Sequence, residues 1–199
     1  MSWRAGDVKS PARRLTAVPI LVAVTLLAYA NSFGAGFALD NKALILQDTR
    51  VHASTRDNVD LILNHTYWWP IGESGLYRPV TTLSYLFNYA VLGNEDRPAG
   101  YHAFNLLLHV VNVILVFAIA LPIADRGMRI ADSRRRPAVP NPQSQSQSQS
   151  AIRNPQSAIL IAAVWAVHPL STEAVTNIVG RADLLAAFAV LSGLLMYVK

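Results

Sequence analysis

The stretch that decides the fold is Tyr101–Ile123, which reads YHAFNLLLHVVNVILVFAIALPI. It contains no Asp, Glu, Lys or Arg, and a helix of this length crosses the roughly 30 Å of hydrocarbon in a bilayer. Its strongly polar residues recur at steps of three, four and three, which places them on one helix face: His102, Asn105, His109 and Asn112. Polar groups within a span face a helix bundle or a cavity, because exposure to lipid is costly. This face therefore either bonds neighbouring helices or lines a cavity for a polar ligand.

Working outward from this stretch, three further apolar runs predict an all-α membrane protein with about four spans, at 15–33, 101–123, 158–170 and 184–198. The composition agrees, because 52% of the 199 residues are hydrophobic and only 15% are charged, against about 25% in an average soluble domain. The first run is open to a second interpretation, a cleaved signal peptide, because Arg13 and Arg14 precede it and Ala28-Tyr29-Ala30 resembles a cleavage site. With no cysteine in the sequence, disulfides and thiolate chemistry are excluded.

Basic residues indicate the orientation. Four precede the first run and six lie within 124–157, whereas the five in the segment 34–100 are spread over 67 residues. Because cytoplasmic segments carry the excess of Lys and Arg, we expect residues 1–14 and 124–157 in the cytoplasm and residues 34–100 and 171–183 on the opposite side. The net charge of +5 does not indicate a nucleic-acid partner, since the bases form two short blocks beside apolar runs.

The two long connecting segments differ in composition. Segment 34–100 is polar and rich in aromatic residues, with helical periodicity at 56–64 and 80–91. We expect it to form an external loop whose short helices lie along the membrane interface. Segment 124–157 repeats Asn-Pro-Gln-Ser around a Gln-Ser run, and this low complexity predicts a disordered cytoplasmic linker.

Candidate chemistry collects on the outer side. Transfer of a sugar from a lipid phosphate needs a carboxylate that accepts a hydroxyl proton and donors that hold the leaving phosphate. Asp40, just after the first run, suits the first role, and Arg181 suits the second. The other candidate substrate-binding residues are Arg78, His102, His109, His168, Glu173 and Asp183. Each of these candidate residues also has a structural interpretation, such as a helix cap or an Arg181–Asp183 ion pair. No cluster of potential ligands in the sequence has the spacing of a metal site.

An ordered set of short motifs resembles the transmembrane, TPR-containing O-mannosyltransferases, a family of the GT-C glycosyltransferase superfamily. The motifs are Asn31-Ser-Phe-Gly, Phe37-Ala-Leu-Asp-Asn41, Tyr67-Trp68, Tyr77-Arg78-Pro79, Gly100-Tyr101-His102, Asn105-Leu-Leu-Leu-His109, His168-Pro169, Glu173-Ala174 and Gly180-Arg181-Ala182-Asp183-Leu184. The resemblance implies a multi-span GT-C fold, a polyprenyl-phosphate-linked sugar such as mannose as donor, and an acid of the first outer loop as base. The family usually has two adjacent acids at this point, whereas this chain has Asp40-Asn41.

The resemblance also implies partners and a location. The family continues with further spans and often TPR repeats, so we expect an amino-terminal part that is inactive alone and pairs with the missing carboxy-terminal part. The expected partners are the bilayer, the lipid-linked donor and an acceptor protein or glycan, in a bacterial inner membrane or, in a eukaryote, the endoplasmic reticulum. Two alternatives are a transporter that binds its solute on the polar face of 101–123 and a non-catalytic membrane adaptor.

Overall fold

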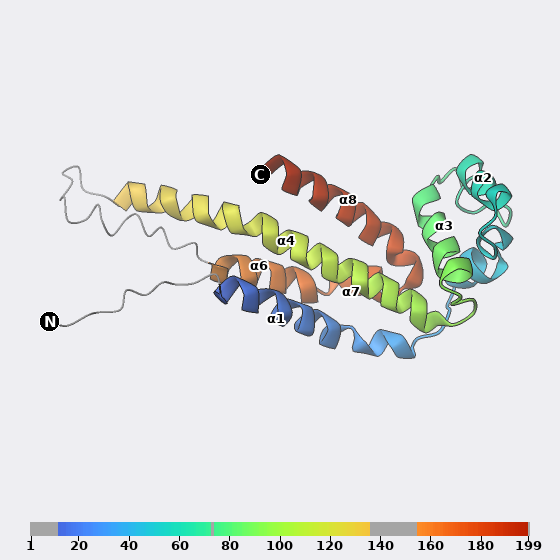
Figure 1. The fold of residues 1–199 in the computed structure, drawn as a ribbon, viewed down its shortest axis with the longest axis horizontal. Helices are drawn as coiled ribbons and strands as arrows, with labels where there is room; N and C mark the ends of the chain where they lie inside the picture. The colour runs from blue at the N-terminus through green and yellow to red at the C-terminus, as the bar shows by residue number, and fades with distance from the viewer. Residues whose placement is uncertain (1–11, 73, 136–154, 199) are drawn as a thin grey trace.

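The structure is a computed structural model that describes residues 12–72, 74–135 and 155–198, and within these ranges it is helical and contains no strand. Four helices run side by side along the long axis, and a lobe of short helices covers one end (Figure 1). The four are α1 (Ala12–Ala28), α4 (Pro98–Arg135), α6 (Pro155–Val167) and α8 (Arg181–Val198). The prediction of an all-α membrane protein is confirmed.

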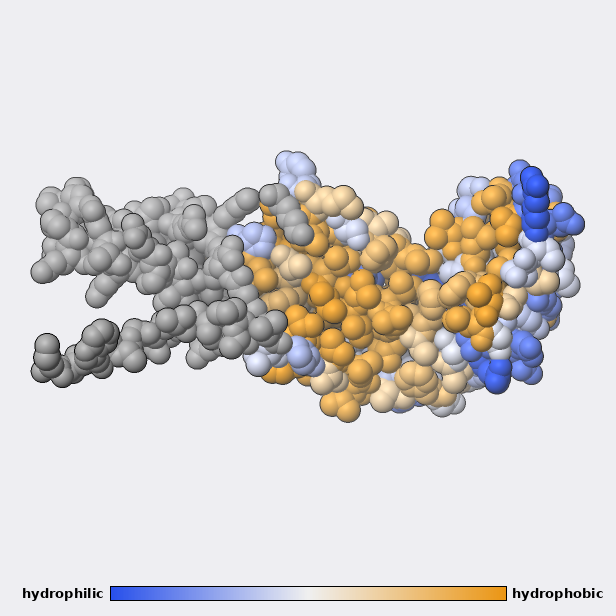
Figure 2. Space-filling view, in the orientation of Figure 1, coloured by the Kyte–Doolittle hydropathy of each residue, from blue (hydrophilic) through white to orange (hydrophobic). Residues whose placement is uncertain are grey.

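Three helical segments are long and apolar enough to span a membrane: Thr16–Gly34, Pro98–Ala124 and Ile178–Val198. Their side chains give the bundle an apolar surface, whereas hydrophilic residues gather on the lobe (Figure 2). The first segment continues from α1 into the short helix η1 (Ala30–Gly34).

The run predicted to span at 158–170 has a different form. Helix α6 ends at Val167, and after His168-Pro169 the chain turns by 61° into α7 (Leu170–Thr176). Proline disfavours helical backbone in the residue before it, which explains the break. Counting the bent pair as one span gives four spans.

Small residues hold the bundle together. Ala158, Ala162 and Ala166 recur every four residues along α6 and are fully buried against α1 and α4. Small side chains let helix backbones approach closely, which is a common means of packing within membranes. From first residue to last, α1 and α6 run toward the lobe, whereas α4 and α8 run away from it (Figure 1).

The lobe contains η2 (Lys42–Gln47), η3 (Thr49–Val51), α2 (Arg56–Asn64), α3 (Pro79–Leu86) and η4 (Phe87–Val91). The Thr55 hydroxyl accepts a hydrogen bond from the Asn58 N–H at 3.2 Å, which caps α2. Pro79 begins α3, where its missing N–H costs no helical hydrogen bond. Buried side chains of the lobe pack on Tyr101 at the start of α4, so the lobe and bundle share a core.

The segment predicted to be a cytoplasmic linker differs from the prediction at its start. The sequence predicts a linker from residue 124, whereas α4 continues as a helix to Arg135. Residues 124–135 are mostly good helix formers, which favours continuation of the helix through this range. Residues 136–154 of the predicted linker, and residues 1–11 of the predicted amino terminus, lie outside the described residues.

Candidate active site at the outer end of the bundle

Asp40 lies in the connection between the first span and the lobe, and its side chain is exposed. Its carboxylate makes no hydrogen bond or ion pair with the part of the chain that the structure describes. The preceding residue, Leu39, has a φ of 47° and a side chain that is 89% exposed. This left-handed backbone costs a residue with a branched side chain roughly 1–3 kcal/mol, and such conformations cluster at functional sites.

Asn41 is the second residue of the Asp40-Asn41 motif and has the opposite environment. It is buried, and its Oδ1 accepts a hydrogen bond from the Val179 N–H at 3.0 Å. Val179 belongs to η5 (Ile178–Gly180), the turn that leads into α8. Asn41 therefore fastens the segment after the first span to the turn before α8 and holds Asp40 at the lobe end of the bundle.

Tyr67 lies beside a cation. The guanidinium carbon of Arg78 lies 5.6 Å from the centre of the Tyr67 ring. Burial raises the pKa of Tyr67 above its usual 10.0; the charge of Arg78 opposes this rise and that of Asp40 adds to it. Arg78 is half-buried, and its guanidinium forms no hydrogen bond with the described residues. Arg78 is therefore a cation of the lobe that remains able to bind an anion.

Tyr85 extends this group toward the bundle. Its hydroxyl lies 3.1 Å from the Tyr67 hydroxyl, and burial raises the pKa of Tyr85 well above 10.0. Both hydroxyls are therefore protonated at neutral pH, and each is available to its partner. The pair joins the segment around Tyr67 to α3.

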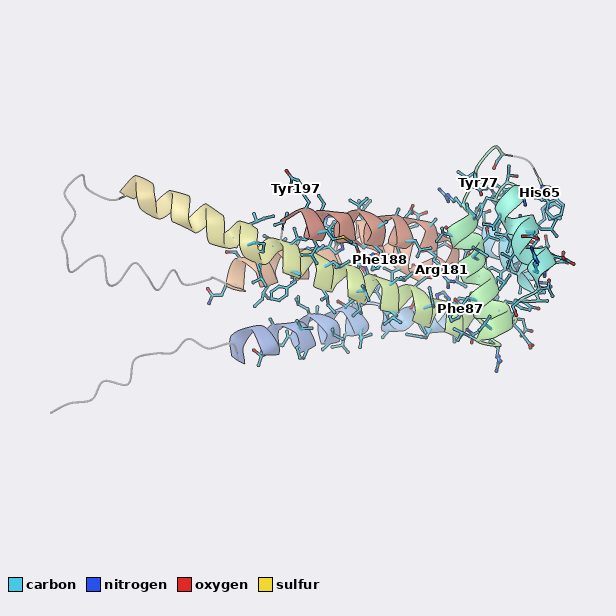
Figure 3. The ribbon with its side chains drawn as sticks, turned by 45° about the horizontal axis from the view of Figure 1, so that its top comes forward. His65, Tyr77, Phe87, Arg181, Phe188 and Tyr197 are labelled. Carbon is cyan, nitrogen blue, oxygen red and sulfur yellow. The ribbon has the colours of Figure 1, made fainter. Side chains whose placement is uncertain are left out.

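Arg181 is fully buried where the lobe meets the bundle (Figure 3). Its Nε donates to Asn105 Oδ1 at 2.8 Å, Nη1 to the Ser84 carbonyl at 3.0 Å, and Nη2 to the Tyr101 carbonyl at 3.2 Å. The guanidinium also lies over the rings of Phe104, Tyr85 and Tyr101, at 4.5, 5.0 and 5.8 Å. Arg181 forms no ion pair with Asp183, which is exposed. The structure thus places Arg181 as a brace between α3, α4 and α8.

A close approach by α7 supports this brace. A Cβ built on Gly180 would lie 2.6 Å from the Ala174 carbonyl oxygen, which is inside van der Waals contact. Only glycine therefore lets α7 pack this tightly against the turn that carries Arg181.

The polar face of α4 forms hydrogen bonds with backbone carbonyls of the other segments of the bundle. Each of its four residues donates to a backbone carbonyl elsewhere: His102 Nε2 to Ala35 at 3.2 Å, Asn105 Nδ2 to Asn177 at 3.1 Å, His109 Nε2 to Ala166 at 3.0 Å, and Asn112 Nδ2 to Leu184 at 2.9 Å. Of the two interpretations of this face, the structure shows bonding between helices. His109 and Asn112 also reach the wall of a cavity.

The remaining predicted residues surround that cavity, which has a volume of about 880 Å³ and lies between α4, α6, α7 and α8. They are His109, His168, Glu173 and Asp183. His168 also ends α6, because its Nδ1 accepts a hydrogen bond from the Leu170 N–H at 3.2 Å. The structure therefore divides the predicted site into Asp40 with Arg78, the buried His102 and Arg181, and the cavity group. Among the described residues, no cluster of three or more His, Asp or Glu could hold a metal ion.

Comparison with known proteins links this arrangement to one family. Protein O-mannosyl-transferase Tmtc3 of Drosophila melanogaster is 33% identical over 98% of this chain, a match that covers 20% of that relative. Mouse TMTC3 is 28% identical over 92% of the chain and human TMTC4 is 29% identical over 90%, with 17% and 22% of those proteins covered. Over most of its own length, the chain is therefore similar to protein O-mannosyl-transferases. It spans about a fifth of the length of these TMTC proteins. No family model and no solved structure matches it.

Sequence reasoning missed one charged pair in this chain. Arg50 and Asp48 form an ion pair at 2.8 Å with both side chains 1% exposed. Arg50 also donates to the carbonyls of Thr66 and Tyr67 at 3.2 Å, so the pair holds the segment that carries Tyr67. The available signal was a charged Asp48-Thr49-Arg50 next to an apolar stretch, where a buried charge needs a partner.

Proposed function

We propose that the chain is part of a membrane glycosyltransferase that transfers a sugar, mannose in our proposal, from a polyprenyl-phosphate donor to a hydroxyl of a protein or other acceptor. Its relatives are named protein O-mannosyl-transferases, which supports transfer of mannose to a protein hydroxyl. The structural observation that carries the proposal is the exposed, unpaired Asp40 carboxylate at the outer end of the bundle. In this proposal, the lobe faces the non-cytoplasmic side of the membrane, and the acceptor binds there.

In the proposed reaction, Asp40 accepts the proton of the acceptor hydroxyl. The hydroxyl oxygen forms a bond to the anomeric carbon, while the bond from that carbon to the phosphate oxygen breaks and leaves polyprenyl phosphate. Negative charge develops on the departing phosphate, and a fixed cation stabilises it. Arg78 is the better candidate for this role than Arg181, because the hydrogen bonds of Arg181 are directed into the protein.

Arg181 and Asn41 are positioning residues in this proposal. Arg181 holds α3 against the bundle, and Asn41 holds the loop that carries Asp40. The transporter alternative needs a mid-membrane face that is free to bind solute. That need is poorly met by α4, since its four polar residues donate to backbone carbonyls.

The test is Asp40→Asn in the full-length protein. General-base catalysis contributes roughly 10²–10⁴-fold, so turnover should fall by that factor while binding of the donor lipid stays near the parental value. The measurement is transfer of radiolabelled mannose from polyprenyl-phosphate mannose to an acceptor protein in membranes. Asp57→Asn is the matched control, because Asp57 is an exposed acid of the same lobe and is expected to leave turnover unchanged. Parental turnover by Asp40→Asn, in protein that inserts normally, would show that the base lies elsewhere.

A further inference from the structure

The cavity between α4, α6, α7 and α8 has an apolar and a polar part. Leu160, Ile161 and Val164 of α6 and Ala187 of α8 line the apolar part. His168, Ser171, Glu173 and Asp183 line the part nearer α7 and the start of α8. Its volume of about 880 Å³ is within the range of sites that take small ligands, roughly 300–1,000 Å³. The division suits an amphipathic molecule with its chain along the helices and its head near α7.

The inner polar groups of this cavity are hydrogen-bond acceptors. Asn112 is fully buried and lines the cavity; its Nδ2 donates to the Leu184 carbonyl, but its Oδ1 has no partner. His109 Nε2 donates to the Ala166 carbonyl, which leaves Nδ1 of the neutral ring as an acceptor. A buried acceptor without a partner costs roughly 1–3 kcal/mol, so a ligand that brings an N–H or O–H group would recover this cost.

The charge of the lining is negative. Glu173 and Asp183 are exposed acids that make no ion pair with the described residues, and the lining contains no Lys or Arg. Their carboxylates attract a cation and repel an anion. Trp165 also lines the cavity, and an indole ring is the best aromatic partner for a cation. Together with the acceptors, these groups favour an ammonium head.

His168 provides a complementary donor. Because its Nδ1 accepts from the Leu170 N–H, its hydrogen lies on Nε2, where it can donate to an oxygen of a ligand. A phospholipid with a terminal ammonium group has both features, an ammonium for the carboxylates and a phosphate oxygen for His168. Such lipids are also close at hand, because Leu160 and Ile161 are 66% and 49% exposed on the apolar surface of the bundle.

We propose that this cavity is a binding site for a phospholipid of the phosphatidylethanolamine type. Its ammonium lies between Glu173, Asp183 and Asn112 Oδ1, and its acyl chain lies along α6 and α8. The proposal does not rest on the proposed sugar transfer, because Asp40 and Arg78 are not among the residues that line the cavity.

Native mass spectrometry of the purified full-length protein, titrated with lipids of identical acyl chains, tests this site. Phosphatidylethanolamine should bind about tenfold more tightly than phosphatidylglycerol, since the ammonium gains two exposed carboxylates and one buried acceptor. Phosphatidylcholine keeps the positive charge but has no N–H, so it should bind with intermediate affinity. Equal affinity for phosphatidylethanolamine and phosphatidylglycerol in the parent protein would overturn the proposal.

Variants assign the preference to this cavity. Glu173→Gln with Asp183→Asn should bring the two affinities within about threefold of each other, because the attraction to the carboxylates is lost. The matched control, Asp57→Asn with Asp60→Asn, removes two exposed acids of the lobe and should leave the tenfold preference intact. An unchanged preference in the cavity variant, displacement of the lipid by polyprenyl phosphate, or absence of any bound lipid would each contradict the proposal. If the cavity variant fails to fold, the parental comparison of lipids still decides.

Discussion

At the scale of single residues, a small number of buried polar side chains determine where the exposed candidate chemistry lies. The Asp40 side chain makes no hydrogen bond with the described residues, and its place depends on its neighbour Asn41, which bonds to Val179. The family motif usually has an acid at the position of Asn41. The amide oxygen of Asn41 accepts the Val179 N–H just as a carboxylate oxygen would. The structural role of this position therefore does not require a second ionised acid.

The Asn41–Val179 bond leads to a prediction about stability. Asn41→Ala leaves the Val179 N–H without its acceptor and should lower the free energy of unfolding by about 1–3 kcal/mol. Asn41→Asp keeps an acceptor oxygen and should lower it less. Thermal unfolding of the detergent-solubilised protein, followed by circular dichroism, measures both. Equal stability of the parent and Asn41→Ala would mean that this bond does not hold the loop.

At the scale of elements, α4 replaces hydrogen bonds that the other helices lose where they break. The carbonyl of Ala166 lies at the end of α6, and its ordinary helical donor, the Leu170 N–H, bonds to His168 instead. His109 supplies the missing donor, and Asn105 Nδ2 donates to the carbonyls of Asn177 and Ile178 beyond α7. Since lipid offers no hydrogen bonds, a broken helix at membrane depth requires such partners.

Arg181 joins three elements, and its replacement should separate them. Arg181→Met removes donors from Asn105 Oδ1 and two carbonyls in a buried place, so we expect a loss of about 3 kcal/mol of stability. Arg181→Lys keeps the charge but cannot reach three acceptors at once, and it should give an intermediate loss. The measurement is thermal unfolding together with protease sensitivity of the lobe.

A matched exposed arginine serves as the control for this series. The Arg56 side chain is 94% exposed on α2, so Arg56→Met should change stability by about 0.5 kcal/mol or less. If Arg181→Met were as stable as Arg56→Met, the guanidinium would not be a brace.

At the scale of the whole molecule, the two ends of the bundle differ in kind. The lobe covers one end, and the chain ends of α1, α4, α6 and α8 that lie far from the lobe share the other (Figure 1). The excess of basic residues before the first span and after the second predicts that this far end lies in the cytoplasm. Asp40, Arg78 and the polar part of the cavity then belong to the opposite side.

Cysteine labelling tests this orientation, because the sequence contains no native cysteine. Ser54→Cys, in the exposed loop before α2, should react with a membrane-impermeant maleimide from the non-cytoplasmic side only. Ser148→Cys, which lies outside the described residues, should react only from the cytoplasmic side. The reverse pattern would refute the orientation and the proposed location of the site.

The sequence by itself determined the all-α membrane class and the polar face of α4. Both depend on local order, since apolar length and helical spacing are properties of consecutive residues. The lobe helix α2 also covers the range that its periodicity indicated, Arg56–Asn64. Residue types and the family resemblance together pointed to Asp40, Arg78 and the acids near α7 as candidates for chemistry.

Only the tertiary structure decided which of these candidates are free. Arg181 and Asp183 are two residues apart in the chain, yet one is buried among aromatic rings and the other lines a cavity. Likewise, Asp40 is exposed while Asn41 is bonded to a residue 138 positions away. The physical reason is that exposure and hydrogen-bond partners depend on the packing of distant segments, which spacing along one helix does not encode.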